Sequence, residues 1–106
     1  MRRGKTVKIG EVIEKLSRRY GFERDLRIWL LRKAWVEKFG KFSRHVMPED
    51  YRRKAIYLHT DSPVWKTELS YLKDEILEAL NPLVNFPIKK VVIKVAPFKP
   101  WEEGID

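Results

Sequence analysis

Residues 55–80 read AIYLHTDSPVWKTELSYLKDEILEAL, a strand pattern that runs directly into an amphipathic helix pattern. The first six residues alternate strongly apolar side chains with polar or aromatic ones, which is the period of a half-buried strand. Ser62 and Pro63 then mark a helix start, because a serine side chain caps the first amide groups and proline suits the first turn. Apolar residues follow every three or four positions, which predicts one helix with a single core-facing stripe. The stripe consists of Trp65, Leu69, Leu72, Ile76 and Leu80.

Two further strand candidates flank this unit. Residues 88–96 form the stronger one. Residues 46–51 form the weaker one, because Pro48 cannot donate to a sheet ladder and therefore suits an edge strand. The predicted core face of the stronger strand holds Val91, Ile93 and Val95. The predicted hairpin tip after the weaker strand consists of Arg52, Arg53 and Lys54.

Two helical patterns precede the strands. Residues 9–20 carry apolar side chains at helical spacing, and Gly21 suits the left-handed position that follows a helix. Residues 23–39 are apolar on more than one face. We therefore expect that helix to be central, packed on the sheet and on the first helix, or else to offer a face to a partner. The tryptophans on helical stripes, which we expect mainly in the core, are Trp29, Trp35 and Trp65.

The resulting order is α-α-β-β-α-β, which predicts an α+β fold with a three-stranded sheet and helices packed on one face. Residues 1–8 form a basic arm, residues 9–96 a single domain and residues 97–106 a short C-terminal tail whose end, WEEGID, is expected to be loose. The other face of the sheet is expected to be open to solvent. It would carry Tyr57, His59, Lys90 and Lys94.

Charge is distributed unevenly along the 106 residues, whose net charge is +8. Residues 1–60 hold 17 basic and 7 acidic side chains, whereas residues 61–106 hold 6 and 8. All ten arginines lie at or before Arg53. A basic half beside a mildly acidic half indicates a polyanion-binding surface on one side. The alternative is the charged surface of a thermophile, since 36% of residues are charged and cysteine is absent; both explanations can hold together.

The sequence gives poor signals for catalysis. It has no cysteine, no glycine-rich phosphate loop and no H-E-x-x-H or G-x-S-x-G motif. His45 and His59 lack carboxylates at metal-ligand spacing, and the adjacent Glu49 and Asp50 are expected to be solvated. Apolar runs are too short to cross a membrane, and no secretory signal begins the chain. We therefore expect a cytoplasmic, non-enzymatic protein without metal or cofactor.

The signals for nucleic-acid binding are stronger. Arginine forks pair with phosphate oxygens, and an exposed hairpin tip with three adjacent positive charges is well placed to meet them. Tyr57, on the open sheet face beside two lysines, could stack on a base while the lysines hold the backbone. The candidate residues are Arg18, Arg19, Arg24, Arg27, Lys41 and Arg44 as one patch near the helix ends, Arg52, Arg53 and Lys54 at the hairpin, and Tyr57, Lys90 and Lys94 on the sheet.

Several dispersed motifs occur in a recognisable order. They are WVEKFG (35–40), FSRH (42–45), Pro48, AIYLHT (55–60), SPVWKTEL (62–69), Leu72, Ile76 and Leu80-Asn81. Over roughly residues 9–96 this order resembles the DciA family. The resemblance implies a KH-like domain without an ATPase site, in a bacterial replication factor that engages the DnaB-type helicase and helps place it on single-stranded DNA. By position, it implies that Trp65 and Leu69 belong to the family's signature helix. We expect this helix to be the helicase-docking face, with Trp65, Leu69 and Glu68 as its partner-binding residues.

The chain departs from that family in two respects. Lys54 stands in the hairpin where the family often has glycine, so this lysine is expected to adopt a left-handed conformation unless the turn differs. Only about ten residues follow the last predicted strand, whereas the family often carries a long basic tail. A G-x-x-G loop is also absent, so the KH mode of clamping a nucleic-acid backbone is not supported. Two alternatives stay open: a KH-like module that binds structured RNA, and a purely structural interaction protein.

Overall fold

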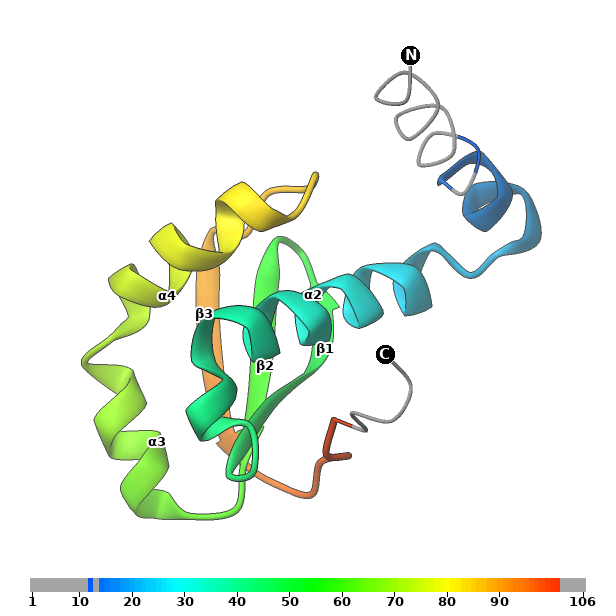
Figure 1. The fold of residues 1–106 in the computed structure, drawn as a ribbon. Coiled ribbons are helices and arrows are strands. Elements are labelled where there is room, and N and C mark those ends of the chain that lie inside the picture. Colours follow the sequence, from blue (N-terminus) through cyan, green and yellow to red (C-terminus); the bar gives the residue numbers. More distant parts are fainter. Residues whose placement is uncertain (1–11, 13, 102–106) are drawn as a thin grey trace.

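A computed structural model describes residue 12 and residues 14–101 of the chain (Figure 1). The predicted basic arm, residues 1–8, lies outside this range. Residues 14–20 are helical, and Gly21 follows with a φ of 81°. The Phe22 amide donates to the Ser17 carbonyl at 2.9 Å, which is the closing hydrogen bond of a Schellman motif. The predicted end of the first helix at Gly21 is therefore confirmed.

Helix α2 spans Glu23–Phe39, as predicted, and a 3₁₀ turn, Gly40–Phe42, follows it. Leu31 and Trp35 are fully buried one helical turn apart, which places this stripe in the core. Trp29 lies off the stripe and is 46% exposed, so the expectation of a core position for Trp29 is wrong.

The sheet contains β1 (Val46–Arg52), β2 (Ala55–Thr60) and β3 (Lys90–Val95) in the order β1-β2-β3. Strands β1 and β2 are antiparallel, whereas β2 and β3 are parallel. Strand β1 is an edge strand, which accommodates Pro48 as predicted. The register shifts between Pro48 and Asp50, so a bulge leaves Glu49 opposite no partner.

The predicted helix 63–80 is two helices, α3 (Pro63–Ser70) and α4 (Lys73–Leu80). Ser62 caps α3 as predicted, since its hydroxyl accepts from the Val64 amide at 3.1 Å. The single-helix expectation is wrong because the last turn of α3 tightens: the Tyr71 and Leu72 amides donate to carbonyls three residues back, at 3.3 and 2.9 Å. The chain then changes direction, and Leu72 is left 37% exposed instead of joining the core stripe.

Asn81 fastens the connection between α4 and β3. Its amide group donates to the Leu77 and Ile88 carbonyls at 3.0 and 2.9 Å, and its carbonyl accepts from the Ile88 amide at 2.9 Å. A second 3₁₀ turn, Asn81–Leu83, begins at this residue. The asparagine that ends the Leu80-Asn81 motif therefore sets where the chain enters the last strand.

One core lies between the helices and the inner face of the sheet, and the expected α+β class with a three-stranded sheet is confirmed (Figure 1). The sheet contributes Ile56, Leu58, Val91 and Ile93, and the helices contribute Leu31, Trp35, Leu69, Ile76 and Leu80. Val95 lies at the strand end and is 50% exposed, so its predicted core position is wrong. The register places Tyr57, His59, Lys90 and Lys94 on the opposite face, as expected. Of these four, only the two lysines are exposed, since Tyr57 and His59 are half-buried and the Pro97 carbonyl contacts His59.

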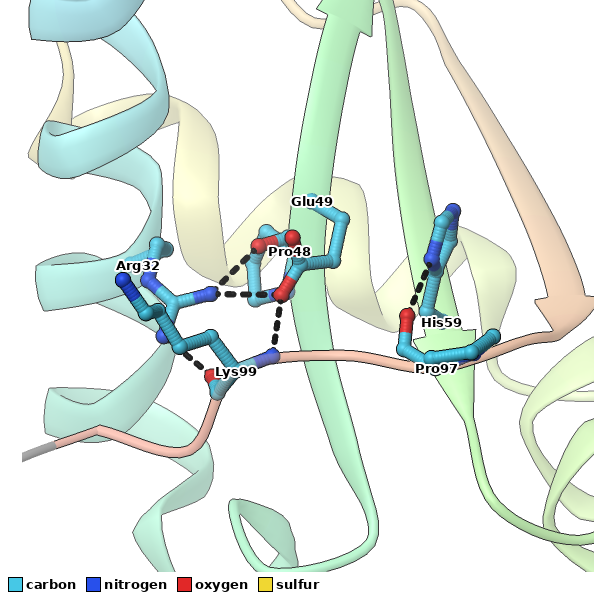
Figure 2. Close-up of polar contacts among 6 residues, drawn as sticks. All are labelled: Arg32, Pro48, Glu49, His59, Pro97 and Lys99. Carbon is cyan, nitrogen blue, oxygen red and sulfur yellow. Dashed lines mark hydrogen bonds and ion pairs between the residues drawn. The ribbon is translucent and has the colours of Figure 1, made fainter.

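The C-terminal segment 97–101 returns across one end of the sheet to α2 (Figure 2). The Pro97 carbonyl lies 2.9 Å from His59 Nδ1, and the Lys99 amide donates to Glu49 Oε2 at 2.7 Å. The Trp101 ring then lies against Trp29, with centroids 6.3 Å apart. The expectation of a loose end is thus wrong for Trp101; residues 102–106 lie outside the described range.

Candidate nucleic-acid interface

The tip of the β1–β2 hairpin is a two-residue turn with two non-glycine residues in left-handed conformations. Arg53 has a φ of 53° and Lys54 a φ of 65°, between the paired residues Arg52 and Ala55. Such turns usually contain Asn-Gly, because each side chain costs roughly 1–2 kcal/mol there. The left-handed conformation expected of Lys54 is confirmed. Arg53 and Lys54 therefore hold exposed positive charges at the tip although their left-handed backbone conformation is unfavourable.

The tip is also tied to the start of β3. The Lys54 carbonyl accepts hydrogen bonds from the Lys89 and Lys90 amides, at 2.7 and 3.3 Å. These bonds fix the hairpin tip relative to the third strand, so its basic side chains project from an anchored backbone.

A hollow of about 390 Å³ separates the hairpin from the start of α2. The first turns of α2 bring Arg24 and Arg27 to it, and the end of β1 brings Arg52 and Arg53. We call this cavity the arginine hollow; it is lined by Gly21, Glu23, Arg24, Arg27, Tyr51, Arg52 and Arg53. Four of the predicted phosphate-binding arginines are thus brought together from two distant parts of the chain.

Asp50 organises two of these arginines. Its carboxylate lies 2.6 Å from Arg24 Nη2 and 3.0 Å from Arg52 Nε. Burial by itself raises the pKa of Asp50, but hydrogen bonds from Arg24 and from the Tyr51 amide, with the charges of Arg24 and Arg52, outweigh it and lower that pKa. The hydrogen bond to Asp50 raises the pKa of Arg24. Asp50 is therefore an ion-pairing residue, and the expectation that it is merely solvated is wrong.

Glu49 is likewise not a solvated carboxylate. Its Oε2 lies 2.9 Å from Arg32 Nη1 and also accepts from the Lys99 amide (Figure 2). Arg32, which sequence reasoning did not single out, donates in addition to the Pro48 carbonyl at 3.1 Å and to the Lys99 carbonyl. Both acidic residues at the bulge thus bind arginines of α2. Because the paired residues are 26 and 17 positions apart in the sequence, no local sequence pattern predicts these ion pairs.

Tyr57 lies next to the hollow on the open face of the sheet. The Arg52 guanidinium carbon is 4.6 Å from the Tyr57 ring centroid, and Lys94 Nζ is 5.6 Å from it. Lys90 lies one row away, opposite Ala55. Aromatic rings and guanidinium planes both stack on bases, so Tyr57 and Arg52 form a platform at the rim of the hollow.

The remaining basic candidates do not form one patch. Arg18 lines a smaller cavity of about 50 Å³ together with Arg27, and Arg19 is exposed on the N-terminal helix. Lys41 and Arg44 follow the far end of α2, whose 17 residues span about 25 Å. The expected single patch at the helix ends is therefore wrong, because α2 holds its two ends apart.

Aromatic side chains gather at the opposite end of the sheet from the hairpin. The Trp65 ring centroid is 5.1 Å from that of Phe42 and 5.2 Å from that of His45, with which it stacks. His45 Nδ1 lies 3.2 Å from Asp61 Oδ2. We call Phe42, His45 and Trp65 the Trp65 cluster. Trp65 is partly buried, so one part of this cluster faces solvent.

The predicted partner residues differ in their exposure. Glu68 is exposed, but Leu69 is only 1% exposed and belongs to the core, so Leu69 supports α3 from inside and presents no surface of its own. Val64 and Tyr71 are 69% and 77% exposed on the same helix region and were missed by sequence reasoning. Their positions off the predicted apolar stripe are the signal that could have identified them.

Within residue 12 and residues 14–101, no group of three or more His, Asp or Glu side chains is placed to hold a metal ion. The helices of that same range include none long and apolar enough to cross a bilayer. The surface features relevant to binding are the arginine hollow, the platform formed by Tyr57 and Arg52 (the Tyr57 platform), and the Trp65 cluster.

Comparisons with known proteins cover these features. The chain matches the family model described as "Dna[CI] antecedent, DciA" over residues 8–93. It is also 26% identical over 98 residues to a protein of Corynebacterium glutamicum (strain R) named "UPF0232 protein". That alignment covers 91% of this chain and 55% of the relative, so the chain spans about half the length of the curated relative it matches. The hairpin and the Trp65 cluster both lie within the residues that match the family.

Proposed function

Since this chain belongs to the DciA family, we propose that it is a non-enzymatic DNA-replication factor that binds the DnaB-type helicase and single-stranded DNA and promotes helicase loading. The family is associated with the DnaB helicase, which supports a role in DNA replication. In this proposal the protein acts by positioning: one surface holds the strand and another holds the helicase.

The observation that carries the DNA-binding part is the convergence of four arginines at the arginine hollow, next to the Tyr57 platform. Phosphate contacts supply most of the affinity of such surfaces, and stacking on aromatic rings adds affinity that does not depend on base sequence. Lys54, Lys90 and Lys94 extend the positive surface from the hairpin onto the open sheet face. A single strand fits this combination of charge and stacking.

The proposed helicase surface is formed by the Trp65 cluster and the exposed side of α3. Strand β2 runs from the hairpin to the start of α3, so the two surfaces lie at opposite ends of the sheet (Figure 1). Val64 and Tyr71 are exposed apolar side chains on either side of Glu68 in the sequence. Large aromatic anchors surrounded by apolar side chains are typical of protein contacts. Because the two surfaces lie at opposite ends of the sheet, the protein can hold a helicase and a strand at the same time.

The decisive experiment measures unwinding of a forked DNA substrate by the DnaB-type helicase, with and without this protein. We expect faster unwinding and no ATP hydrolysis by the protein alone. Trp65→Ala should weaken the complex more than it lowers the free energy of unfolding. Equal losses would assign Trp65 to folding alone, and unchanged unwinding at several ratios of the two proteins would count against the proposal.

The DNA-binding part is tested by the salt dependence of affinity for single-stranded DNA. Replacing Arg52, Arg53 and Lys54 by glutamine should change the slope of log affinity against log salt by about 2, at roughly 0.7 per phosphate contact. The control removes three exposed lysines elsewhere, Lys38, Lys66 and Lys73. An unchanged slope would move the DNA surface to other arginines. Preference for structured RNA with no helicase binding would favour the RNA-binding alternative.

A further inference from the structure

We infer that the arginine hollow is a binding site for a phosphate monoester, the group carried by the phosphorylated end of a nucleic-acid strand or by a free nucleotide. The inference rests on the proposed function, because it names the chemical group that one part of the DNA surface would take. Its structural support comes from the four arginines, the shape of the cavity and the start of α2, whose first residues line it.

The first argument is charge. Four arginines and Glu23 line the arginine hollow, and Asp50 pairs with two of the arginines, Arg24 and Arg52. Four positive and two negative side chains leave a local charge of about +2. A phosphate monoester carries about −1.5 to −2 near neutral pH, which matches this excess, whereas an internal phosphodiester carries a single negative charge.

The second argument is which arginines are available. Arg24 and Arg52 already bind Asp50, so their guanidinium groups are held in place. Arg27 and Arg53 have no ion pair within residues 14–101. They approach the cavity from different elements, α2 and the hairpin tip. The Arg27 guanidinium carbon lies 5.6 Å from the Phe86 ring centroid, so among the described residues this group has an aromatic contact but no carboxylate partner. Arg27 and Arg53 thus leave two guanidinium forks without carboxylates, which suit a group with three free oxygens.

The third argument is shape. The cavity of about 390 Å³ is concave and lies in the size range of roughly 300–1,000 Å³ that is typical of small-molecule sites. An internal phosphate of a strand that lies along a surface can be bound without such a recess. A terminal group can enter the recess while the rest of the strand continues over the Tyr57 platform at its rim.

The start of α2 adds a favourable dipole. The helix has 17 residues, and Phe22 at its N-cap supplies no side-chain hydrogen bond to the first turn. The N-terminal end of a helix of this length carries a partial positive charge that favours anions. Gly21 and Arg24, which flank this end, both line the cavity. Glu23 and Asp25 in the first turn offset part of this dipole, so the arginines supply most of the attraction for an anion.

The test compares oligonucleotides of one sequence that carry a 5′-phosphate, a 3′-phosphate or only hydroxyl ends. Binding is measured by fluorescence anisotropy of an internal dye. We expect one of the phosphorylated ends to bind about tenfold tighter than the hydroxyl form, as expected for new charge-assisted hydrogen bonds. Arg27→Gln should abolish this preference. Because Arg27 also belongs to the proposed DNA surface, affinity for the hydroxyl form should fall too, but by a smaller factor than affinity for the phosphorylated form. The control variant Lys38→Gln, in the last turn of α2, should keep the preference.

Calorimetric titrations with a free nucleoside monophosphate and with inorganic phosphate distinguish the two sources of the group. Binding of the monophosphate, lost in Arg27→Gln, supports the site even if strands bind weakly. If hydroxyl and phosphorylated strands bind equally and neither small anion binds, the inference is overturned while the proposed DNA binding stands. If no strand binds but the monophosphate does, the proposed function fails and the site remains.

Discussion

Arg24 Nη2 lies 2.6 Å from Asp50 Oδ1, and this contact joins the start of α2 to the edge strand β1 across 26 residues of sequence. The same carboxylate holds Arg52 from its other side, at 3.0 Å. One acidic residue therefore fixes two arginines of the hollow and, at the same time, removes part of the positive charge that a polyanion would meet. Asp50 consequently links the stability of the domain to its binding surface.

Because the pKa of Asp50 is lowered, its contribution to the free energy of unfolding depends on pH in the acid range. Its pKa in the folded protein lies below the ordinary value of 3.8, so the stabilisation is complete above that value and is lost as pH falls through the folded pKa. We expect Asp50→Asn to flatten the decline in the free energy of unfolding between about pH 4 and pH 2, measured by urea titration. Asp74→Asn, an exposed position on α4, is the control. An identical acid decline in both variants would contradict the coupling.

The same Asp50→Asn variant should bind single-stranded DNA more tightly at neutral pH. Removing the carboxylate frees Arg24 and Arg52 to bind phosphate, although it also releases them from their fixed positions. We expect affinity to rise at low salt and to become more salt-dependent, because more phosphate contacts are possible. Anisotropy titrations at several salt concentrations measure this. Weaker binding would mean that Asp50 contributes more by positioning the arginines than it costs by neutralising them.

The left-handed hairpin tip predicts a trade between stability and binding. Lys54→Gly removes a side chain from a residue with a φ of 65°, and we expect the free energy of unfolding to rise by about 0.5–1 kcal/mol. Affinity for single-stranded DNA should fall, since one positive charge is lost. Lys54→Gln is the matched control, because it removes the charge and keeps the strained backbone. Equal stability of the two variants would show that the turn stores no strain.

Thr60 predicts a stabilising substitution. It is fully buried, and its hydroxyl has no hydrogen-bond partner in the part of the chain that the structure describes. Thr60→Val keeps the shape and removes the unpaired polar group, so we expect a gain of about 1 kcal/mol in urea unfolding. Thr67→Val on α3, where the hydroxyl donates to the Pro63 carbonyl at 3.1 Å, should show no such gain. A loss of stability in Thr60→Val would indicate a buried water bound to the hydroxyl.

Local signals predicted most of the fold, because helix starts and strand periods are set by neighbouring residues. The cap at Ser62 and the span of α2 followed from such signals. The break at Tyr71 did not, since the apolar spacing of the predicted helix continues across it while the backbone hydrogen bonds shorten to three residues. The order of the elements was therefore predictable, but the division of the crossover into two helices was not.

The candidate site was predictable only in part for a related reason. Arg52, Arg53 and Lys54 are consecutive in the sequence, so a basic hairpin tip was predicted from the sequence alone. The role of Asp50 depends on Arg24, which lies 26 residues away, and no local pattern relates the two. The hairpin residues Arg52 and Arg53 supply one wall of the hollow, and α2, distant in sequence, supplies the other.

The C-terminal segment gives the last prediction, because the Glu49 carboxylate binds both its Lys99 amide and Arg32 of α2. Glu49 accepts from the Lys99 amide at 2.7 Å and from Arg32 Nη1 at 2.9 Å, and the Arg32 side chain is only 12% exposed (Figure 2). Glu49→Ala would leave that arginine without its carboxylate, and we expect a loss of about 1–3 kcal/mol in the free energy of unfolding.

The loss should be accompanied by release of the segment itself. Amide hydrogen exchange at Lys99 is expected to accelerate strongly in Glu49→Ala, while exchange in β2 follows only the change in global stability. Glu37→Ala, an exposed position on α2, serves as the control and should alter neither. If Lys99 stays protected in Glu49→Ala, the remaining contacts would hold the segment in place: Arg32 with the Lys99 carbonyl, His59 with the Pro97 carbonyl, and Trp101 with Trp29 at a centroid separation of 6.3 Å. Trp101→Ala in the Glu49→Ala background then measures what the Trp101–Trp29 contact contributes, because Glu49→Ala removes the bond to Lys99 and Trp101→Ala removes the contact at residue 101.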